Sequence, residues 1–433
     1  MGKFIQVKVN LIFYSFISFF LLIIITFNIF NLYNTIPGDG WGYNELFVNY
    51  SEGFIRRGLL GEIFQMSYKH FEIDPKKFFI VFLSIIHFLN TIIFLNLLKQ
   101  YRDSKLFLIL IAFSPALLLF PIYDINVFLA KDVFTNFAIL LHAFVACKTI
   151  RNKNNLRLYG RLLKYLIIPI LFFNLLNHEN QFFFLTVHFL IALLVYEVKN
   201  FNGLKILFPF AILLIPIALV ISFSQLSELS LINLNENLYN NYGVKVNSEI
   251  SGNINLKIGG FLKQHFAYNS IGNFLNFFFC FLLSIFFIFI IFQYFLEKKI
   301  INFNSYLKKY YLLFFLPCFA LFMSALDHGR TINIFLTHLI SFYLALKINN
   351  NKFKIVVSSF NKSFFLKNLS FIFLIFYVFL WYIPVGGGYD AIGTFSEGDT
   401  IFKSTLMSEL IDLFMIIYDF IDYNVINLPR IVV

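Results

Sequence analysis

Apolar runs of about 20 residues recur along most of the chain, and they constrain its fold more than any other feature. Hydrophobic residues make up 59% of the 433-residue sequence, and charged residues make up only 13%. An α-helix needs a run of about 20 apolar residues to cross the hydrocarbon core of a bilayer. Outer-membrane barrels show short alternating segments instead, and the sequence lacks that pattern. The sequence therefore predicts one all-α integral membrane domain over residues 1–433, a polytopic helical bundle of about eleven transmembrane spans.

The predicted spans follow from the positions of the apolar runs. They cover residues 11–32, 78–98, 106–122, 133–147, 165–176, 182–196, 204–223, 274–295, 310–325, 331–346 and 369–384. The basic stretch 148–164 is interpreted as an inner loop, which leaves 165–176 short for a span. Residues 406–423 carry acidic side chains at a helical spacing. This stretch is therefore predicted to be a peripheral C-terminal helix at the membrane surface.

The distribution of charge predicts the orientation of the chain. With the N-terminus in the cytoplasm, most Lys and Arg residues fall on the inner side and most Asp and Glu residues on the outer side. This distribution agrees with the positive-inside rule. The extracytoplasmic segments are then 34–77, the large loop 224–271, and 386–433. The net charge of +11 is explained by this orientation, so we predict no nucleic-acid partner.

Cysteine usage and short motifs exclude several classes of protein. The chain has three cysteines, and none has the spacing of a metal-ligand set or of a disulfide framework. Nucleotide-binding glycine motifs and the metalloprotease motif are also absent. The sequence therefore predicts neither a metal site nor a cofactor.

The densest group of charges lies in the first outer segment, within GDGWGYNELFVNYSEGFIRRGLLGE. Its charged residues are Asp39, Glu45, Glu52, Arg56, Arg57 and Glu62. Two adjacent guanidiniums before an apolar helical run, with glycines on both sides, would suit a diphosphate ligand. The alternative is an interfacial helix whose arginines reach lipid headgroups.

Three further polar clusters are predicted to lie on the same side of the membrane. They are Lys131 with Asp132, His178 with Glu179, and the stretch from Asp327 through His328 to Arg330. The first is interpreted mainly as a helix start, since an acidic residue is favourable at a helix N-terminus. The second is either a general base with an orienting carboxylate or a turn cap. The third is either a functional site or an Asp–Arg pair that closes a helical hairpin.

Helical periodicity adds two expectations for side chains inside the spans. Arg330, Asn333 and Thr337 would share one face of the helix that follows Asp327. Histidines also occur within the apolar runs, at positions 87, 142, 188 and 338. They are interpreted as hydrogen-bonded packing residues between helices.

Four short stretches carry a resemblance to a known family. These are SEGFIRRGLLG, FLAKDVF, LLNHENQFFF and ALDHGRTI. With the number of spans and the large outer loop, they resemble the Wzy-type polymerases of bacterial O-antigen or capsular polysaccharide, which are grouped with GT-C-like glycosyltransferases.

The resemblance implies an enzyme that joins repeat units carried on undecaprenyl diphosphate, at the periplasmic face of the inner membrane. Its partners would be the lipid-linked glycan, the bilayer and a chain-length regulator, and no cofactor is implied. Arg56, Arg57 and Arg330 are then expected to hold the diphosphate. The candidates for the catalytic base are Asp39, Glu52, His178 and Glu179. Supporting roles are expected for Asp327, Lys131, Asp132 and His328.

Two other classes of membrane protein remain open at this point. A GT-C transferase with a polyprenyl-phosphate sugar donor would need acidic residues in the first outer loop, and Asp39 and Glu45 satisfy that requirement. A lipid-linked oligosaccharide flippase would show inverted repeats, broken helices and charges near the midplane. The clustering of charges on one side of the membrane disfavours the flippase.

Overall fold

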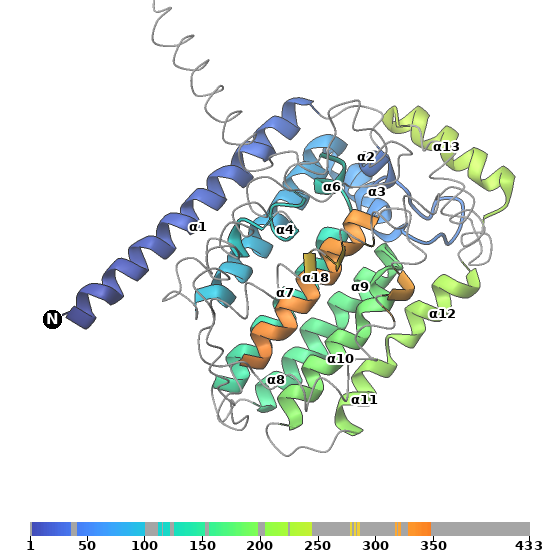
Figure 1. Ribbon diagram of the computed structural model, residues 1–433. Coiled ribbons are helices and arrows are strands. Elements are labelled where there is room, and N and C mark those ends of the chain that lie inside the picture. Colours follow the sequence, from blue (N-terminus) through green and yellow to red (C-terminus); the bar gives the residue numbers. More distant parts are fainter. Residues whose placement is uncertain are drawn as a thin grey trace, which may run out of the picture.

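The computed structural model describes residues 2–35, 41–99, 111–114, 116–121, 125–151, 156–197, 204–223, 226–244 and 328–347, with a few isolated positions between 278 and 321. Within this part of the chain every regular element is helical (Figure 1). The helices are α1 (Gly2–Thr35), α2 (Trp41–Glu45), α3 (Leu59–Phe71), α4 (Pro75–Leu98), α6 (Ile125–Phe128), α7 (Asp132–Arg151), α8 (Leu156–Leu162), α9 (Ile168–Asn177), α10 (Gln181–Glu197), α11 (Leu204–Ala211), α12 (Leu214–Phe223), α13 (Glu228–Tyr242) and α18 (His328–Lys347). The predicted all-α class is therefore confirmed for the described residues.

The long helices lie side by side as a bundle, and α7 is at its centre. This helix packs most extensively against α18 and α4, and it also contacts α10 and α9. The short helices α2, α3 and α6 lie together at one end of the bundle, and α8 lies at the opposite end (Figure 1). The described part of the predicted outer segment 34–77 thus folds onto a single end of the bundle, which we call the outer end.

Two described helical stretches, Lys77–Leu98 and Leu156–Asn177, are long and apolar enough to cross a membrane. Each has 22 residues. On α4 the exposed large side chains Val81, Ile85 and Leu89 recur at intervals of four residues and are all apolar. Such a stripe suits contact with lipid tails, although the number of spans stays a prediction.

One predicted span, 106–122, is not a continuous helix where the structure describes it. Ile111 and Ala112 are helical, but 116–121 form successive turns that are mostly buried. The sequence places a proline directly after Ser114, and a residue before proline disfavours the helical conformation. The side-chain amide of Asn333 donates to the carbonyl oxygens of Ala116 and Leu117, at 2.9 Å each. These bonds satisfy backbone acceptors that are buried away from water.

The predicted basic loop 148–164 is wrong over its last nine residues. Helix α8 begins at Leu156, and a π-helical turn, Leu163–Ile167, joins it to α9. The charges at 157, 161 and 164 are exposed on this continuous helix, whereas Tyr159 is fully buried. Long basic side chains can keep their charge in water while their stems cover a helix. A basic stretch therefore did not mark the end of the helix.

Other predicted boundaries changed or lie outside the described residues. The span 204–223 divides into α11 and α12, with Pro209 inside α11. The outer loop 224–271 contains α13, and its remaining residues from 245 onward are outside the described part. The same holds for 369–384, for the segment 386–433 with its predicted peripheral helix, and for most of 274–295 and 310–325.

An aromatic cluster packs α13 over the first outer segment. Phe47, Phe64, Phe79 and Tyr242 bring their rings to centroid distances between 5.0 and 5.9 Å. Buried aromatic pairs of this kind contribute stability beyond their burial of area. The described parts of the predicted outer segments 34–77 and 224–271 are thus folded against each other.

Two glycines of the first outer segment are required by close approaches. A Cβ atom on Gly61 would collide with the backbone of Val48, and one on Gly58 would collide with the ring of Tyr50. The glycines allow α3 to lie directly against the turn that follows α2. This contact brings Arg56 and Arg57 toward the ends of α7 and α9.

Candidate functional site

Arg57 is the centre of a buried group of charges at the outer end of the bundle. Its Nε and Nη2 atoms donate to the carboxylate of Glu179 at 2.9 and 2.5 Å, in a bidentate pair. Its Nη1 atom donates to Glu45 Oε1 at 2.8 Å. Glu45 ends α2 and Glu179 follows α9. One guanidinium thus joins two segments that are far apart in the sequence.

The backbone of Arg57 is held in a conformation that favours glycine. Its φ is +67°, which is uncommon for a residue with a side chain. The Nζ atom of Lys131, which is 1% exposed, donates to the Arg57 carbonyl oxygen at 2.5 Å. This bond fixes the turn that directs the Arg57 side chain between its two carboxylates.

Arg56 has a different position from its neighbour. Its Nη1 atom lies 3.6 Å from Glu179 Oε1, an oxygen that Arg57 already binds at 2.5 Å. The Arg56 side chain is 12% exposed. The two adjacent arginines therefore differ in position. Arg57 donates hydrogen bonds from all three of its side-chain nitrogen atoms, whereas Arg56 lies at the edge of the group.

A second ion pair joins the first turns of α7 and α18. Arg330 Nε donates to Asp132 Oδ2 at 2.5 Å, and both residues are buried. His178, which follows the last residue of α9, places its Nε2 atom 3.7 Å from the other Asp132 oxygen. Asp132 is the first residue of α7, where the helix dipole favours a negative charge.

These charged residues form one group, which we call the ion network. Its members are Glu45, Arg56, Arg57, Lys131, Asp132, His178, Glu179 and Arg330. The basic side chains, excluding histidine, outnumber the carboxylates by one. Because burial lowers the pKa of His178 to about 4, this residue is neutral at pH 7. The network therefore has an excess of one positive charge in a region of low dielectric constant.

Neighbouring cations hold both glutamates of the network in the ionised form. Burial alone would raise the pKa of Glu45, but Arg57, Lys131 and Arg330 together lower it to about 2. For Glu179 the opposing effect of burial is outweighed by Arg57 and then by Arg56, and the pKa lies well below its usual range. Burial lowers the pKa of Lys131 to about 8, although Glu45 opposes this change. Glu45 and Glu179 are therefore ionised at neutral pH and are poor proton acceptors.

The hydrogen bonds of His178 also disfavour it as a base in this geometry. The backbone N–H of Asn180 donates to its Nδ1 atom at 3.2 Å. The neutral ring then carries its proton on Nε2, which faces Asp132. Its only lone pair is therefore occupied, and His178 is better placed to orient Asp132 than to accept a proton.

Four other residues were predicted for the site, and the described residues connect none of them to the ion network. Glu52 lies in the turn after Tyr50, and no hydrogen bond or ion pair connects it to the ion network within the described residues. Asp39 and Asp327 lie outside the described residues, so the predicted Asp327–Arg330 pair does too. His328 is the first residue of α18.

Sequence reasoning missed the amides that hold the network in place. Asn177 accepts a hydrogen bond from the backbone N–H of Leu60 at 2.9 Å, which joins the start of α3 to the end of α9. Asn174 donates to the carbonyl oxygen of Phe134 at 2.8 Å. Asparagines within or at the end of an apolar run were the available signal, since buried amides need partners.

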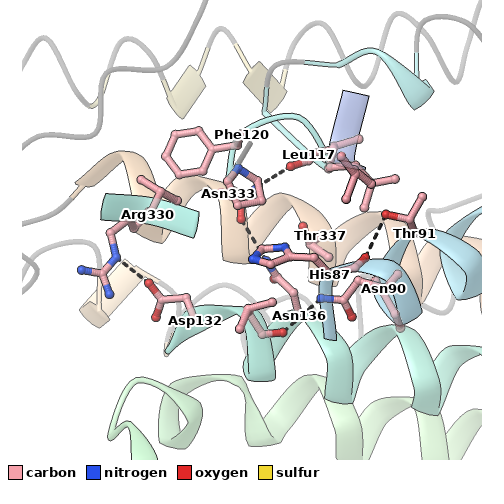
Figure 2. Close-up of a pocket in the computed structure, with 16 residues that line it drawn as sticks. His87, Asn90, Thr91, Leu117, Phe120, Asp132, Asn136, Arg330, Asn333 and Thr337 are labelled. Atoms are coloured by element: carbon pink, nitrogen blue, oxygen red, sulfur yellow. Dashed lines mark hydrogen bonds and ion pairs between the residues drawn. The ribbon is translucent and has the colours of Figure 1, made fainter. Parts of the chain in front are cut away.

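A small cavity lined by both polar and apolar side chains lies next to the Asp132–Arg330 pair (Figure 2). Its polar lining comes from α4 (His87, Asn90, Thr91), α7 (Asp132, Asn136) and α18 (Arg330, Asn333, Thr337). The predicted common face of Arg330, Asn333 and Thr337 is therefore confirmed. The cavity volume is about 30 Å³, which is room for roughly two water molecules. It is too small for a sugar ring, so a glycan would have to bind elsewhere.

The low pKa of Glu45 predicts a measurable pH dependence of stability. Because the pKa is lower in the folded state than the ordinary 4.5, the stabilisation is complete above pH 4.5 and is lost as the pH falls toward 2. We expect the free energy of unfolding to decrease by about 3 kcal/mol over this window through Glu45. Unfolding titrations in detergent should show a weaker pH dependence of the free energy of unfolding for Glu45→Gln than for wild type. Glu228→Gln, a change at an exposed glutamate, is the control and should keep the wild-type pH dependence. An equally steep dependence in Glu45→Gln would contradict the assignment.

The described residues contain no group of three or more His, Cys, Asp or Glu side chains arranged to hold a metal ion. No protein-family model, curated protein sequence or solved structure matches the chain.

Proposed function

We propose that the protein is a polytopic inner-membrane glycosyltransferase that joins oligosaccharide repeat units carried on undecaprenyl diphosphate, at the periplasmic face. The observation that supports this most strongly is the ion network at one end of an apolar helical bundle. Its excess positive charge is matched to an anionic group that arrives at the membrane surface. Charge in a site of low dielectric constant interacts more strongly than in water, and it needs no reorganisation during a reaction.

Arg56 is proposed to contact the diphosphate, while Arg57 supports it. Glu179 is already bound by Arg57 through three contacts of 3.1 Å or less, whereas its distance to Arg56 is 3.6 Å. A phosphate oxygen can therefore bind Arg56 without uncovering the Glu179 charge. As the diphosphate leaves the sugar, negative charge on the leaving group would be stabilised by Arg56. Arg330, which Asp132 binds, would contribute from the opposite side of the network.

The proton acceptor is proposed to come from the first outer segment. Glu45 and Glu179 have pKa values far below neutrality, and the lone pair of His178 is occupied. Glu52 and Asp39 are the remaining candidates from the sequence. Either would remove the proton from the acceptor hydroxyl as the glycosidic bond forms.

Two alternatives follow from particular observations. A polyprenyl-monophosphate sugar donor would also suit a network with one excess positive charge. The non-helical backbone at 116–121 is similar to the broken helices of transporters, and it favours a flippase as the second alternative. Against the flippase, the ionised side chains of the network lie at one end of the bundle.

Reconstitution with defined lipids would separate these functions. Purified protein in liposomes should convert a lipid diphosphate that carries one repeat unit into a ladder of longer glycans, with no nucleotide sugar. The products can be resolved by gel electrophoresis and mass spectrometry. Sugar transfer from a polyprenyl monophosphate alone would establish the first alternative instead. Movement of the lipid-linked glycan across the bilayer without a new glycosidic bond would establish the flippase.

A further inference from the structure

Lys131 differs from the other cations of the ion network in having no carboxylate partner. It directly precedes α7, and it is 1% exposed. Its Nζ atom donates to the Arg57 carbonyl oxygen at 2.5 Å, and the described residues give it no second acceptor. No carboxylate oxygen of the described residues lies within 4.0 Å of this nitrogen. An ammonium group has three N–H donors, so two of the three have no protein partner here.

The other charged members of the network form two groups that are each neutral. The first group has two arginines and two carboxylates, which are Arg56, Arg57, Glu45 and Glu179. The second group is the pair of Arg330 and Asp132. His178 adds no charge at pH 7, because burial lowers its pKa to about 4. The excess positive charge of the ion network therefore lies on Lys131.

The Lys131 charge lacks a counter-charge in a buried position. Removing an ammonium group from water is costly unless a negative charge lies next to it. Glu45 attracts Lys131, but the Oε1 atom of Glu45 is already bound to Arg57 Nη1 at 2.8 Å. An anion that reaches the outer end of the bundle would supply the negative charge that the network lacks.

The Lys131 ammonium lies close to the residue proposed to contact the diphosphate. It binds the carbonyl oxygen of Arg57, and Arg56 is the preceding residue. The Arg56 side chain is 12% exposed and lies at the edge of the network. Because charges interact over several ångströms where the dielectric constant is low, an anion on Arg56 would be attracted by Lys131 even though the ammonium itself is covered.

The hydrogen bond of Lys131 is compatible with both of its protonation states. A neutral amine keeps two N–H groups, so it can still donate to the Arg57 carbonyl oxygen. The turn at Arg57, whose φ is +67°, would then be held in either state. Loss of a proton from Lys131 would therefore change the charge of the network without releasing the Arg57 side chain.

We propose that protonated Lys131 supplies the uncompensated charge that draws the lipid diphosphate to Arg56 and sets its affinity. This inference rests on the function proposed above, and it identifies the residue on which binding of the donor depends. The other charged and titratable groups of the network come from α2 (Glu45), the turn before α3 (Arg56, Arg57), the start of α7 (Asp132), the segment after α9 (His178, Glu179) and α18 (Arg330).

The proposal implies that binding of the donor weakens at alkaline pH. Burial lowers the pKa of Lys131 to about 8, although Glu45 opposes this change. Below pH 8 the ammonium is charged and ready to bind an anion. Above pH 8 one proton must be taken up for each donor that binds, so the Kd should rise by up to about tenfold per pH unit. Glu45, with a pKa of about 2, and His178, with a pKa of about 4, keep their charge states over this range.

Binding of a soluble lipid diphosphate provides the test. The probe is farnesyl diphosphate esterified to N-acetylglucosamine, and its charge is constant because both phosphates are esterified. Its Kd for full-length protein in detergent micelles is measured by calorimetry between about pH 6.5 and 9.5. For wild type we expect a constant Kd below pH 7.5 and a rise of about 10- to 30-fold by pH 9.5.

Three variants assign this change to Lys131. Lys131→Met removes the charge at similar length, so its Kd at pH 7 should equal that of wild type at pH 9.5 and should not rise further. Lys131→Arg stays charged over the whole range, so it should bind the probe tightly at pH 9.5. Lys69→Met, a change at an exposed lysine of α3, is the matched control and should keep the wild-type profile. Size-exclusion profiles establish that each variant is folded.

A purely structural role for Lys131 gives a different result. If Lys131 only held the turn at Arg57, its neutral amine would still do so, and the wild-type Kd would be the same at pH 7 and pH 9.5. That result would overturn the proposal, as would an alkaline rise of wild-type size in Lys131→Met. Absence of binding at every pH would overturn it together with the diphosphate site. Glycan ladders measured at pH 7 report on the transferase separately, so the two failures are distinguishable.

Discussion

Replacing Arg56 by Gln is expected to lower glycan polymerisation by about 100- to 1000-fold, which is the usual cost of losing a donor directed at transition-state charge. The amount of folded protein in the membrane should stay close to wild type. The physical reason is that Glu179 keeps its three short contacts with Arg57 when Arg56 is removed. The measurement is the length distribution of glycan in a reconstituted or complemented system, normalised to the amount of protein.

Lys69→Gln is the matched control for this experiment. Lys69 also belongs to the first outer segment, but it is exposed on α3, so its removal should leave the ladder unchanged. If Arg56→Gln produced a wild-type ladder at equal protein level, the contact between Arg56 and the diphosphate would be excluded.

Replacing Arg57 by Met is expected to act on stability, with a loss of about 3–5 kcal/mol in the free energy of unfolding. The change removes the guanidinium that neutralises Glu45 and Glu179, and the Glu45 side chain is only 1% exposed. An uncompensated buried carboxylate is far more costly than a missing ion pair, since its solvation is lost without replacement. Reversible unfolding in mixed detergent micelles would measure the loss.

A combined variant separates this account from a loss of packing. Arg57→Met together with Glu45→Gln and Glu179→Gln removes the cation and both anions, so most of the lost stability should return. If the combined variant were as unstable as Arg57→Met alone, the cost would arise from packing or from the turn at Arg57. The two adjacent arginines thus have separable expected effects, one on rate and one on stability.

Helices that form from one uninterrupted apolar run were predicted well. The spans 78–98, 182–196 and 331–346 correspond to α4 (Pro75–Leu98), α10 (Gln181–Glu197) and α18 (His328–Lys347). Hydropathy and helical period are local properties, and a long run of apolar residues leaves the backbone few alternatives to a helix. For the same reason the common face of Arg330, Asn333 and Thr337 could be read from spacing alone.

Irregular backbone inside the bundle could not be read in this way. The turns at 116–121 lie in an apolar stretch, and two of their carbonyl groups, those of Ala116 and Leu117, accept hydrogen bonds from Asn333, which is 216 residues away from Leu117. An interruption of this kind is stable only if another helix supplies donors. A sequence gives no sign of that donor until the helices are packed.

Compared with the helix positions and the irregular backbone, the pairing of charges depended most strongly on how the helices pack. Sequence proximity suggested Asp327 as a partner of Arg330, and that residue lies outside the described part of the chain; the partner that the structure shows is Asp132, which accepts a hydrogen bond from Arg330 Nε and is 198 residues away. The structure also gives the adjacent side chains of Arg56 and Arg57 different positions. Arg57 lies between Glu45 and Glu179, whereas Arg56 lies at the edge of the network. The sequence determines which residues are charged and which segments are apolar, because charge and hydropathy are properties of each residue. Which charges meet is set by how the ends of α7, α9 and α18 come together, since a buried charge is stabilised by its neighbours in space.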